Sequence, residues 1–503
     1  MSLTLAFLLA LGVACTLAHP EIHDLPTKPG ARVCINHSGM EMAKEVASKA
    51  MRKEMKNMKM TWMHTKPGSD QCIFHLMENP KMTDYVHPEF KVDFSPPSTL
   101  VWETEGGHVN VSGNWKLDKE GQEYTGTYWI FLKDMELEFP LYLTKSEEGK
   151  PKVEPKSCHF EAECDQWDMK WDQEPTEDLK KEAAGFMKKS FEEMLNKRVC
   201  EQAETLITAR VSYLFAHWPL QVPLSKKIPV MADFTLLENP MVTDSFITMM
   251  LRGGIFWKGT EGTPFEPPTL PEIPEKVANK MLVLQATDYA MNSYMWAMHN
   301  HGITNYIVTP EKLGKFGVLL ATSCEEICMG KVSKELAKTY PDAMVHLHVV
   351  GKKPITFKTD ETGMYFSGVG EIHAYIPKNE ERGWTENITL IKTDFNFNGQ
   401  MVNISCLKQE NKIHGEVKFD EIKFHLTETK LTDVTQATME KLAELALKKD
   451  KTRFQDTMDR LTGKGIPLPM LPGLKMIGEP EMIFQNGGFI VATDVEMIPP
   501  KEE

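Results

Sequence analysis

The chain has 503 residues and a mass of 57.2 kDa, a length that excludes a peptide hormone or a small disulfide-stapled toxin and allows several domains. Hydrophobic residues make up 41% and charged residues 25% of it, which is typical of a globular protein and not of a collagen-like, coiled-coil or disordered chain. The net charge of −14 repels polyanions, so the composition argues against a nucleic-acid partner.

The N-terminal segment, residues 1–18, is apolar and has no charged side chain. The small residues Thr16 and Ala18 suit the cleavage site of a secretory signal peptide, which predicts a mature chain that begins at His19. The segment is too short for a transmembrane helix, and no later segment approaches about 18 consecutive apolar residues. The sequence therefore predicts a secreted, extracellular protein without a stable transmembrane anchor.

Secretion decides how the cysteines are interpreted. Cys15 leaves with the signal peptide, and the remaining eight of nine cysteines enter an oxidising compartment in which disulfides are expected. Cys324 and Cys328 suit two metal ligands on one helical face, but no partner pair follows, so oxidation, pairing with distant cysteines or burial is favoured. Four sequons fit the same compartment and are candidate glycosylation sites: Asn36, Asn110, Asn387 and Asn403.

Two helices and a sheet are predicted in the first half of the mature chain. From Gly39 to about His64, apolar residues recur three or four positions apart while basic residues fill the other faces, which indicates an amphipathic helix with a basic back. Short alternating runs broken by Gly and Pro between Cys72 and Val153 indicate an antiparallel meander. A second helix of about thirty residues is predicted after Thr176.

The second half is predicted to repeat this order after a linker. Five prolines between Gly259 and Lys276 exclude a helix or a central strand, so this segment is predicted to be extended. The elements expected after it are helices over Asp288–His301 and Lys312–Thr339, strands over Met344–Val350 and Ile388–Cys406, a long helix over Thr432–Thr462 and a last strand over Met482–Val495.

Several local strings follow one another in a specific order. They are Pro29-Gly-Ala-Arg-Val-Cys-Ile-Asn-His-Ser-Gly39, Val111-Ser-Gly-Asn-Trp-Lys116, Pro264-Phe-Glu-Pro-Pro268, Leu284-Gln-Ala-Thr-Asp-Tyr289, Gly465-Ile-Pro-Leu-Pro469 and Phe489-Ile-Val-Ala-Thr-Asp-Val495. In this order they resemble the family of bactericidal/permeability-increasing protein, lipopolysaccharide-binding protein, phospholipid transfer protein and cholesteryl ester transfer protein. The resemblance covers nearly all of the mature chain.

The resemblance implies an α+β fold with two pseudo-symmetric β-barrel-like domains. Each domain would be an antiparallel twisted sheet with long helices, and a central sheet would join the two domains into a boomerang. The expected boundaries are residues 19–258 for an N-terminal lipid-binding barrel, 259–276 for the proline-rich linker and 277–503 for a C-terminal lipid-binding barrel.

The resemblance also implies a lipid in an apolar pocket between the sheet and the long helix of each domain. At about 0.8 kcal/mol per buried CH₂, two long acyl chains supply well over about 10 kcal/mol before ordering costs. Candidate pocket residues on the predicted helices are Met51, Met55, Phe186, Phe191 and Leu195. The alternative for each is that it packs the protein core, as the apolar face of a helix usually does.

A basic island interrupts this acidic chain. From Lys44 to Met60, six basic residues oppose two acidic ones. The candidate contacts for phosphates of lipopolysaccharide or of an anionic membrane are Arg52, Lys53, Lys56 and Lys59, and the alternative is a solvated helix face. The resemblance aligns a second cationic loop with Lys116-Leu-Asp-Lys-Glu-Gly-Gln-Glu123, where Lys116 and Lys119 meet three acidic residues that nearly cancel their charge.

A disulfide between Cys158 and Cys200 is a further implication of the resemblance. Cys164 is the alternative partner of Cys200. Closing a loop of about 40 residues stabilises a fold by roughly 3 to 4 kcal/mol in the chain-entropy model. The partners of the other cysteines stay open, namely Cys34, Cys72, Cys324, Cys328 and Cys406.

Signatures of common catalytic sites are absent from the sequence, which has no Gly-x-Ser-x-Gly, His-Glu-x-x-His, P-loop or Gly-x-Gly-x-x-Gly string. The pairs His346/His348 and His299/His301 lack an evident third ligand, so no metal and no cofactor are expected. We therefore predict a non-catalytic, secreted protein that binds phospholipid, and lipopolysaccharide or bacterial membrane surfaces, in antimicrobial innate defence. The alternatives are a phospholipid transfer or carrier protein, an esterase with an unfamiliar motif, and a storage glycoprotein.

Overall fold

The structure is a computed structural model of the whole chain. It describes residues 23–56, 63–65, 72–76, 81–119, 121–226, 228–260, 262–325, 328–407, 410–441, 465–468, 470 and 474–497. The predicted signal peptide, residues 1–18, lies outside the described residues.

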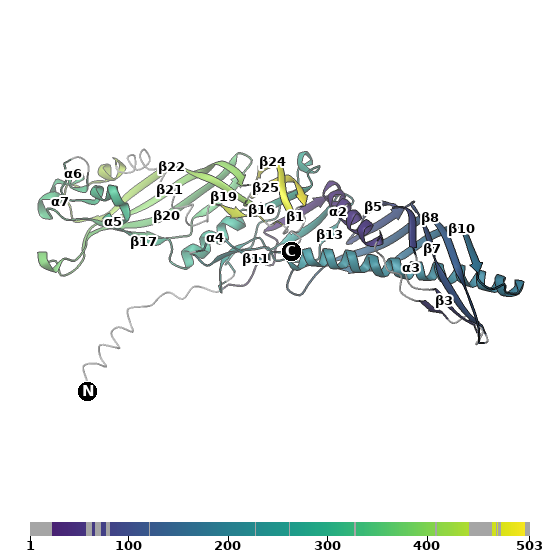
Figure 1. Cartoon of the computed structure of the whole chain (residues 1–503). Helices are drawn as coiled ribbons and strands as arrows, with labels where there is room; N and C mark the ends of the chain where they lie inside the picture. Colours follow the sequence, from purple (N-terminus) through teal and green to yellow (C-terminus); the bar gives the residue numbers. More distant parts are fainter. Residues whose placement is uncertain are drawn as a thin grey trace, which may run out of the picture.

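The molecule is elongated and has four antiparallel sheets, of which the three large ones follow one another along its length (Figure 1). The expected α+β class with twisted antiparallel sheets is confirmed. In the described part of the chain, no helix is both long enough and apolar enough to cross a bilayer.

The central sheet combines strands from the two halves of the chain. Its strand order is β13-β14-β1-β16-β25-β24, with β1 at Ala31–Asn36, β13 at Met241–Val242, β14 at Phe246–Leu251, β16 at Leu282–Thr287, β24 at Leu474–Gln485 and β25 at Gly488–Met497. The pairing of β1 with β16 brings Ala31 opposite Ala286, so the first strand of the sequence joins the two halves at the middle of the sheet.

The N-terminal half contributes a sheet of nine strands and a small sheet of three. The larger sheet contains β2 (Met63–Thr65), β3 (Cys72–Leu76), β4 (Lys81–Val86), β5 (Glu89–Ser95), β6 (Thr99–Glu105), β7 (His108–Lys119), β8 (Gln122–Lys145), β9 (Pro151–Pro155) and β10 (His159–Trp171). The smaller one contains β11 (Gln221–Pro223), β12 (Val230–Asp233) and β15 (Ile255–Trp257). The predicted meander between Cys72 and Val153 is thus observed as β3 to β9.

Two helices pack against the larger sheet. Helix α2 (His37–Lys56) begins after Asn36, whose Oδ1 accepts a hydrogen bond from the backbone N–H of Gly39 at 3.0 Å and so caps the helix. Helix α3 (Glu177–Ala216) begins after Thr176, whose Oγ1 accepts from Leu179 N–H at 3.3 Å. The 40 residues of α3 extend about 60 Å, and its buried face packs against the aromatic core of the sheet.

The C-terminal half contributes a seven-stranded sheet. It contains β17 (Asn305–Val308), β18 (His346–Gly351), β19 (Thr356–Asp360), β20 (Gly363–Ile376), β21 (Ile388–Leu407), β22 (Lys412–Thr429) and β23 (Ile466–Pro467). Helix α4 (Tyr289–Asn300) lies between this sheet and the central sheet. The predicted helix over Asp288–His301 and the predicted strand over Ile388–Cys406 are confirmed within one or two residues.

Several predicted boundaries are wrong. The first helix does not reach His64, because Met63–Thr65 is strand β2. The predicted helix over Lys312–Thr339 is four short pieces, α5 (Pro310–Leu313), η2 (Gly314–Leu320), α6 (Met329–Val332) and α7 (Lys334–Thr339), interrupted around the Cys324–Cys328 loop. The last strand is a hairpin of β24 and β25. Of the predicted helix over Thr432–Thr462, residues 436–441 are helical and 442–464 lie outside the described residues.

The proline-rich segment runs across the central sheet without forming a strand, as its prolines predict. In the described residues 262–274 no helix or strand forms, and a 3-10 turn, η1, follows at Glu275–Val277. The backbone oxygen of Pro271 accepts hydrogen bonds from Arg32 Nη2 at 2.5 Å and from Gln285 Nε2 at 3.1 Å. These contacts hold the segment on the face of β1 and β16.

The disulfide predicted between Cys158 and Cys200 is confirmed, with a Cα–Cα distance of 5.6 Å. It ties α3 to the segment just before β10. A second disulfide joins Cys324 to Cys328, so these two cysteines pair with each other and not with a metal or with distant cysteines.

Candidate functional site: an apolar cavity and a charged tip

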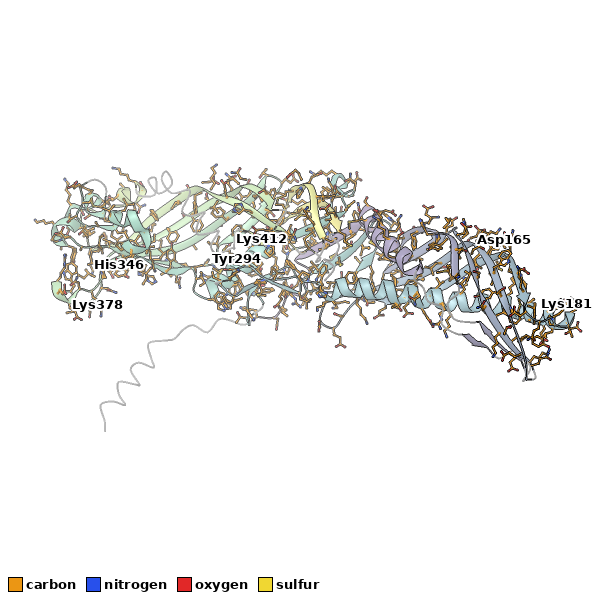
Figure 2. All side chains as sticks on the ribbon, in the orientation of Figure 1. Asp165, Lys181, Tyr294, His346, Lys378 and Lys412 are labelled. Atoms are coloured by element: carbon orange, nitrogen blue, oxygen red, sulfur yellow. A yellow bond between two sulfur atoms is a disulfide. The ribbon has the colours of Figure 1, made fainter. Side chains whose placement is uncertain are left out.

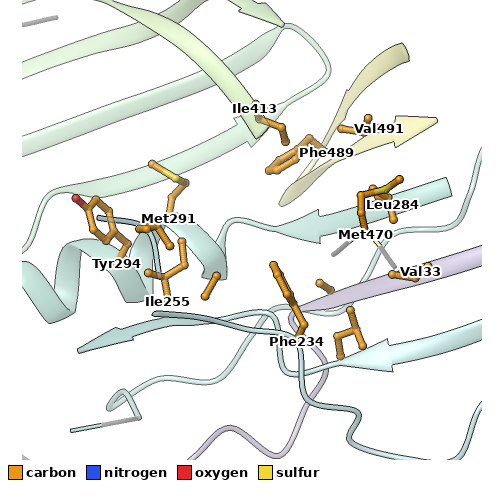
Figure 3. Close-up of a cluster of buried hydrophobic side chains, with 14 of the residues drawn as sticks. Val33, Phe234, Ile255, Leu284, Met291, Tyr294, Ile413, Met470, Phe489 and Val491 are labelled. Atoms are coloured by element: carbon orange, nitrogen blue, oxygen red, sulfur yellow. The ribbon is translucent and has the colours of Figure 1, made fainter. Parts of the chain in front are cut away.

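An apolar cavity lies where the central sheet, α4 and the C-terminal sheet meet. Its volume is about 40 Å³, and its lining side chains are almost all apolar. Figure 3 shows Phe234, Met291, Ile413 and Phe489, which reach it from β12 and its following loop, α4, β22 and β25. The residues that line the cavity therefore come from both halves of the chain.

Local sequence explains why the backbone comes close to this cavity. Gly253 adopts φ +70°, and a Cβ there would lie 2.6 Å from the backbone nitrogen of Ala31, so only glycine fits. Beside it, the buried carboxylate of Asp233 accepts a hydrogen bond from Arg252 Nη1 at 2.7 Å. This ion pair fixes the turn between β14 and β15 that forms one wall.

Methionines are unusually frequent in the core around the cavity. Seven are buried there: Met249, Met291, Met295, Met298, Met364, Met470 and Met476. Because methionine is unbranched and has three rotatable bonds, it fills irregular space and repacks readily. Such a wall can change shape around an apolar guest.

Polar atoms buried without a hydrogen bond in and beside this core include Gln285 Oε1, on a residue that lines the cavity, and the hydroxyl of Tyr294, which does not line it. The side chain of Tyr294 on α4 is 1% exposed, and its hydroxyl is buried without a hydrogen bond (Figure 3). Burial raises the pKa of Tyr294 and keeps the hydroxyl neutral, as a potential donor. An unsatisfied buried hydroxyl costs about 1 to 3 kcal/mol, which an acceptor oxygen on a bound molecule would offset.

Of the predicted pocket residues in the N-terminal half, the structure describes the side chain of Leu195 alone. Leu195 is 7% exposed and packs in the core between α3 and the sheet, in the same cluster as Val199 and Leu179. For this residue the structure favours the core-packing alternative. The side chains of Met51, Met55, Phe186 and Phe191 lie outside the described residues.

The end of the N-terminal half farthest from the central sheet is a charged tip formed by the β7–β8 turn and the start of α3 (Figure 1). Figure 2 places Lys181 at this end. Lys116 pairs with Glu123 at 2.5 Å, and Lys119 pairs with Glu182 at 2.8 Å. These two predicted tip lysines are therefore already neutralised by neighbouring carboxylates.

The four other predicted tip residues are on or just after the C-terminal end of α2. The side chains of Arg52, Lys53, Lys56 and Lys59 lie outside the described residues. Earlier in α2, Lys44 forms an ion pair with Glu41, and Lys49 forms one with Glu45 at 2.6 Å. Any excess positive charge of this helix thus depends on Arg52, Lys53, Lys56 and Lys59.

The four sequons occupy different environments. Asn387 and Asn403 are exposed, and Asn110 is half-buried on β7. Asn36 is 6% exposed, and its Nδ2 donates to the backbone oxygen of Ala278 at 3.2 Å while its Oδ1 caps α2. A sugar on Nδ2 would have to fit at a side chain that is buried and held by these two contacts, so the structure argues against Asn36.

The histidine pairs have structural roles in the described residues. His301 stacks on Trp257 with ring centroids 4.1 Å apart, and His299 Nδ1 lies 3.0 Å from Thr304 Oγ1. The rings of His348 and His373 lie 5.9 Å apart on neighbouring strands. Among the described residues, no three His, Cys, Asp or Glu side chains gather as a metal-ligand set.

Comparison with known proteins identifies the family. Residues 48–214 match the model of the LBP / BPI / CETP family N-terminal domain, and residues 225–497 match that of the C-terminal domain. The chain belongs to this family. Two observations agree with that assignment. The family-like sequence strings follow one another in the expected order, and a large sheet lies on each side of a central sheet.

Relatives and a solved structure support the family across most of the chain. Human lipopolysaccharide-binding protein is 21% identical over 76% of this chain and 75% of that protein. Rat bactericidal permeability-increasing protein is 20% identical over 97% of this chain and 96% of that protein, whereas the match to the rabbit lipopolysaccharide-binding protein spans 43% of it. A crystal structure of lipopolysaccharide-binding protein matches with a TM-score of 0.54 at 15% identity, over 94% of this chain and all of the other, which shows a shared fold.

The cavity could not have been assigned from the sequence alone. Its lining residues are spread from Ala31 to Phe489, and only the central sheet brings them together. Two local signals point to it in retrospect: the adjacent glycines Gly253 and Gly254, and the methionine-rich helix α4.

Proposed function

We propose that this family member is a secreted lipid-binding protein that holds phospholipid acyl chains in the apolar core at the junction of the central sheet, α4 and the C-terminal sheet. The observation that supports this most directly is the cavity of about 40 Å³ walled by adaptable apolar side chains from both halves. Its relatives are named for binding lipopolysaccharide or for acting on bacterial permeability, and antimicrobial innate defence is the proposed role.

The cavity is smaller than an acyl chain, so binding requires repacking of the wall. Small ligands are held in mostly apolar concave sites with few polar groups, and each buried CH₂ contributes about 0.8 kcal/mol. Met291 lines the cavity and the other methionines pack in the same core, and such side chains can move with little strain. Phospholipid uptake is therefore expected to be a slow exchange that leaves the fold intact.

Filling the cavity with protein is expected to displace lipid. Ala290 on α4 lines the cavity and is 8% exposed. In Ala290→Met the new side chain adds three heavy atoms, the volume of about three acyl CH₂ groups, or about 2.4 kcal/mol, so phospholipid retained through purification should fall about 50-fold. Native mass spectrometry of protein secreted from eukaryotic cells measures it.

The matched control is Ala297→Met. Ala297 is 5% exposed on the same helix but does not line the cavity. The two variants risk a similar overpacking cost of about 1 to 3 kcal/mol, and circular dichroism reports whether each is folded. If Ala297→Met loses as much lipid as Ala290→Met, or neither loses any, lipid does not bind at this cavity.

Tyr294 packs in the core around the cavity but does not line it, so its hydroxyl is expected to hydrogen-bond to an oxygen of the bound phospholipid once the wall has repacked around the acyl chain. Tyr294→Phe should then lower phospholipid retention about fivefold, the equivalent of about 1 kcal/mol for one hydrogen bond. The delipidated variant should be at least as stable to denaturant as the delipidated wild type, because it no longer buries an unpaired hydroxyl. Unchanged retention would show that the lipid leaves Tyr294 unpaired.

A phospholipid carrier is the second candidate function, and it is favoured by the near-neutral pairing at the tip. Lys116 and Lys119 are already paired with Glu123 and Glu182, which leaves the contact with anionic lipopolysaccharide to the α2 residues. Transfer of labelled phospholipid between neutral vesicles, with no preference for anionic acceptors, would favour the carrier.

A further inference from the structure

The outward face of the N-terminal sheet exposes an aromatic strip. Trp129 on β8 is 38% exposed, whereas its neighbours Tyr128 and Ile130 point inward and are 3% and 2% exposed. Phe131, the next outward residue, is half-buried, and its ring lies 5.5 Å from that of His108 on β7. An exposed tryptophan on a sheet face is costly in water, so a covering group would stabilise it.

A sequon lies directly opposite this strip. In the pairing of β7 with β8, Asn110 is opposite Phe131 and Ser112 is opposite Trp129. Val111 between them points inward and is 1% exposed. Because side chains alternate along a strand, Asn110, Ser112, Phe131 and Trp129 share the outward face, and opposite pairs have Cβ atoms about 5 Å apart.

The amide of Asn110 is turned in the required direction. Its Oδ1 is buried and has no hydrogen-bond partner, so Nδ2, the atom that an N-glycan occupies, is the outward one. Asn36 differs, because its Nδ2 is engaged with Ala278. Of these two sequons in the N-terminal half, Asn36 is buried with its Nδ2 engaged, whereas Asn110 is half-buried.

We propose that Asn110 bears an N-glycan whose first sugar packs on Trp129 and Phe131, so that the glycan is the cover of this sheet face. In the attachment step, Nδ2 bonds to the anomeric carbon of an oligosaccharide donated by a polyisoprenyl pyrophosphate. The bond from that carbon to the pyrophosphate oxygen breaks, and Nδ2 loses one proton. The apolar face of the pyranose then lies on the indole ring, where C–H groups meet the negative π face.

Negative charge on β10, the strand paired with β8, disfavours an anionic group on this sheet face. On β10 the exposed Asp168 is opposite Trp129, while Glu163 and Asp165 share a single cation, Lys133, at 3.4 and 3.5 Å, so these three carboxylates leave an excess of negative charge. An anionic membrane or lipopolysaccharide phosphate would meet these negative charges, whereas a neutral sugar would not. The proposal requires passage through the secretory pathway and is independent of lipid binding.

The first test is occupancy. The full chain secreted from cultured mammalian cells is digested, and the peptide containing Asn110 is analysed by mass spectrometry before and after enzymatic deglycosylation. We expect a glycan on Asn110 and none on Asn36. A bare Asn110 in the secreted, folded protein would overturn the proposal.

The second test measures whether the sugar and the indole stabilise one another. Ser112→Ala removes the sequon while keeping Asn110, and Trp129→Ser removes the ring. On the wild-type background, loss of the glycan should lower the melting temperature by about 2 to 4 °C, the shift that corresponds to about 1 kcal/mol in a half of this size. On the Trp129→Ser background, the same loss should change it by less than about 1 °C.

The control is Asn387→Gln, which removes a sequon in an exposed loop. Its effect should be the same with and without Trp129→Ser, because the two positions are in different sheets. Equal effects of Ser112→Ala on both backgrounds would overturn the packing of the sugar on Trp129. Trimming the glycan to a single sugar should preserve the stabilisation, and its loss on trimming would contradict a contact by the first sugar.

Discussion

Binding to anionic vesicles is expected to fall about 1,000-fold at low salt when Arg52, Lys53, Lys56 and Lys59 are replaced together by glutamine. Each basic residue near an anionic surface contributes about 1 kcal/mol, and four other lysines of α2 and of the tip, Lys44, Lys49, Lys116 and Lys119, have carboxylate partners. The four replaced residues therefore supply most of the attraction. Glutamine retains a high helix propensity, so α2 should persist. Vesicle co-sedimentation at several salt concentrations measures the loss.

The matched control removes four positive charges from the C-terminal half. Lys331, Lys334, Lys338 and Lys353 lie in or near the C-terminal sheet, and changing them to glutamine alters the net charge equally. Wild-type binding should weaken as the Debye length shrinks from about 8 Å at physiological salt to about 3 Å at 1 M. Retained phospholipid should not change. If the control variant loses as much vesicle binding, net charge and not the α2 residues governs adhesion.

Removal of the Cys158–Cys200 disulfide is expected to destabilise the N-terminal half by about 4 kcal/mol. The two cysteines are 42 residues apart, and the chain-entropy model assigns about this stabilisation to a loop of that length. The bridge also fixes one side of α3 against β10. The double variant Cys158→Ser/Cys200→Ser should therefore unfold at a lower denaturant concentration, followed by circular dichroism.

The second disulfide provides an internal comparison. Cys324 and Cys328 are four residues apart, so their loop should contribute only about 2 kcal/mol in the same model. Cys324→Ser/Cys328→Ser should therefore shift the unfolding midpoint about half as far. A larger effect from the short loop would show that native contacts around residues 324–328, and not loop closure, dominate.

The spacing of apolar residues predicted those helices and strands in which one face is buried and the other is exposed. Helix α3 was expected because buried Leu179, Ala183, Leu195 and Val199 recur at helical spacing, and alternation predicted β21 almost to the residue. The segment from Lys312 to Thr339 also has helical spacing. It breaks instead into short turns, because the Cys324–Cys328 loop and the 3-10 turn at Gly314–Leu320 interrupt it.

The candidate site depended on contacts that no local pattern encodes. The cavity needs Ala31 beside Ala286 and Phe489, which are brought together only by pairing across the whole chain. The ion pair of Lys119 with Glu182 likewise depends on where the β7–β8 turn meets α3, whereas Lys116 pairs with Glu123 within the β7–β8 hairpin. The sequence indicated that charge there is nearly cancelled, but not which carboxylate neutralises which lysine.

The position of β1 between β14 and β16 also has a consequence for synthesis of the protein. Ala31 pairs with Leu251 on one side and with Ala286 on the other, so about 220 to 255 residues must follow before either edge of this strand is paired. At a synthesis rate of about 5 to 20 residues per second, β1 remains unpaired for about 10 to 50 s. During that interval its unpaired N–H and C=O groups are open to other strands. Expression should therefore depend on folding factors that act while the chain is still being made.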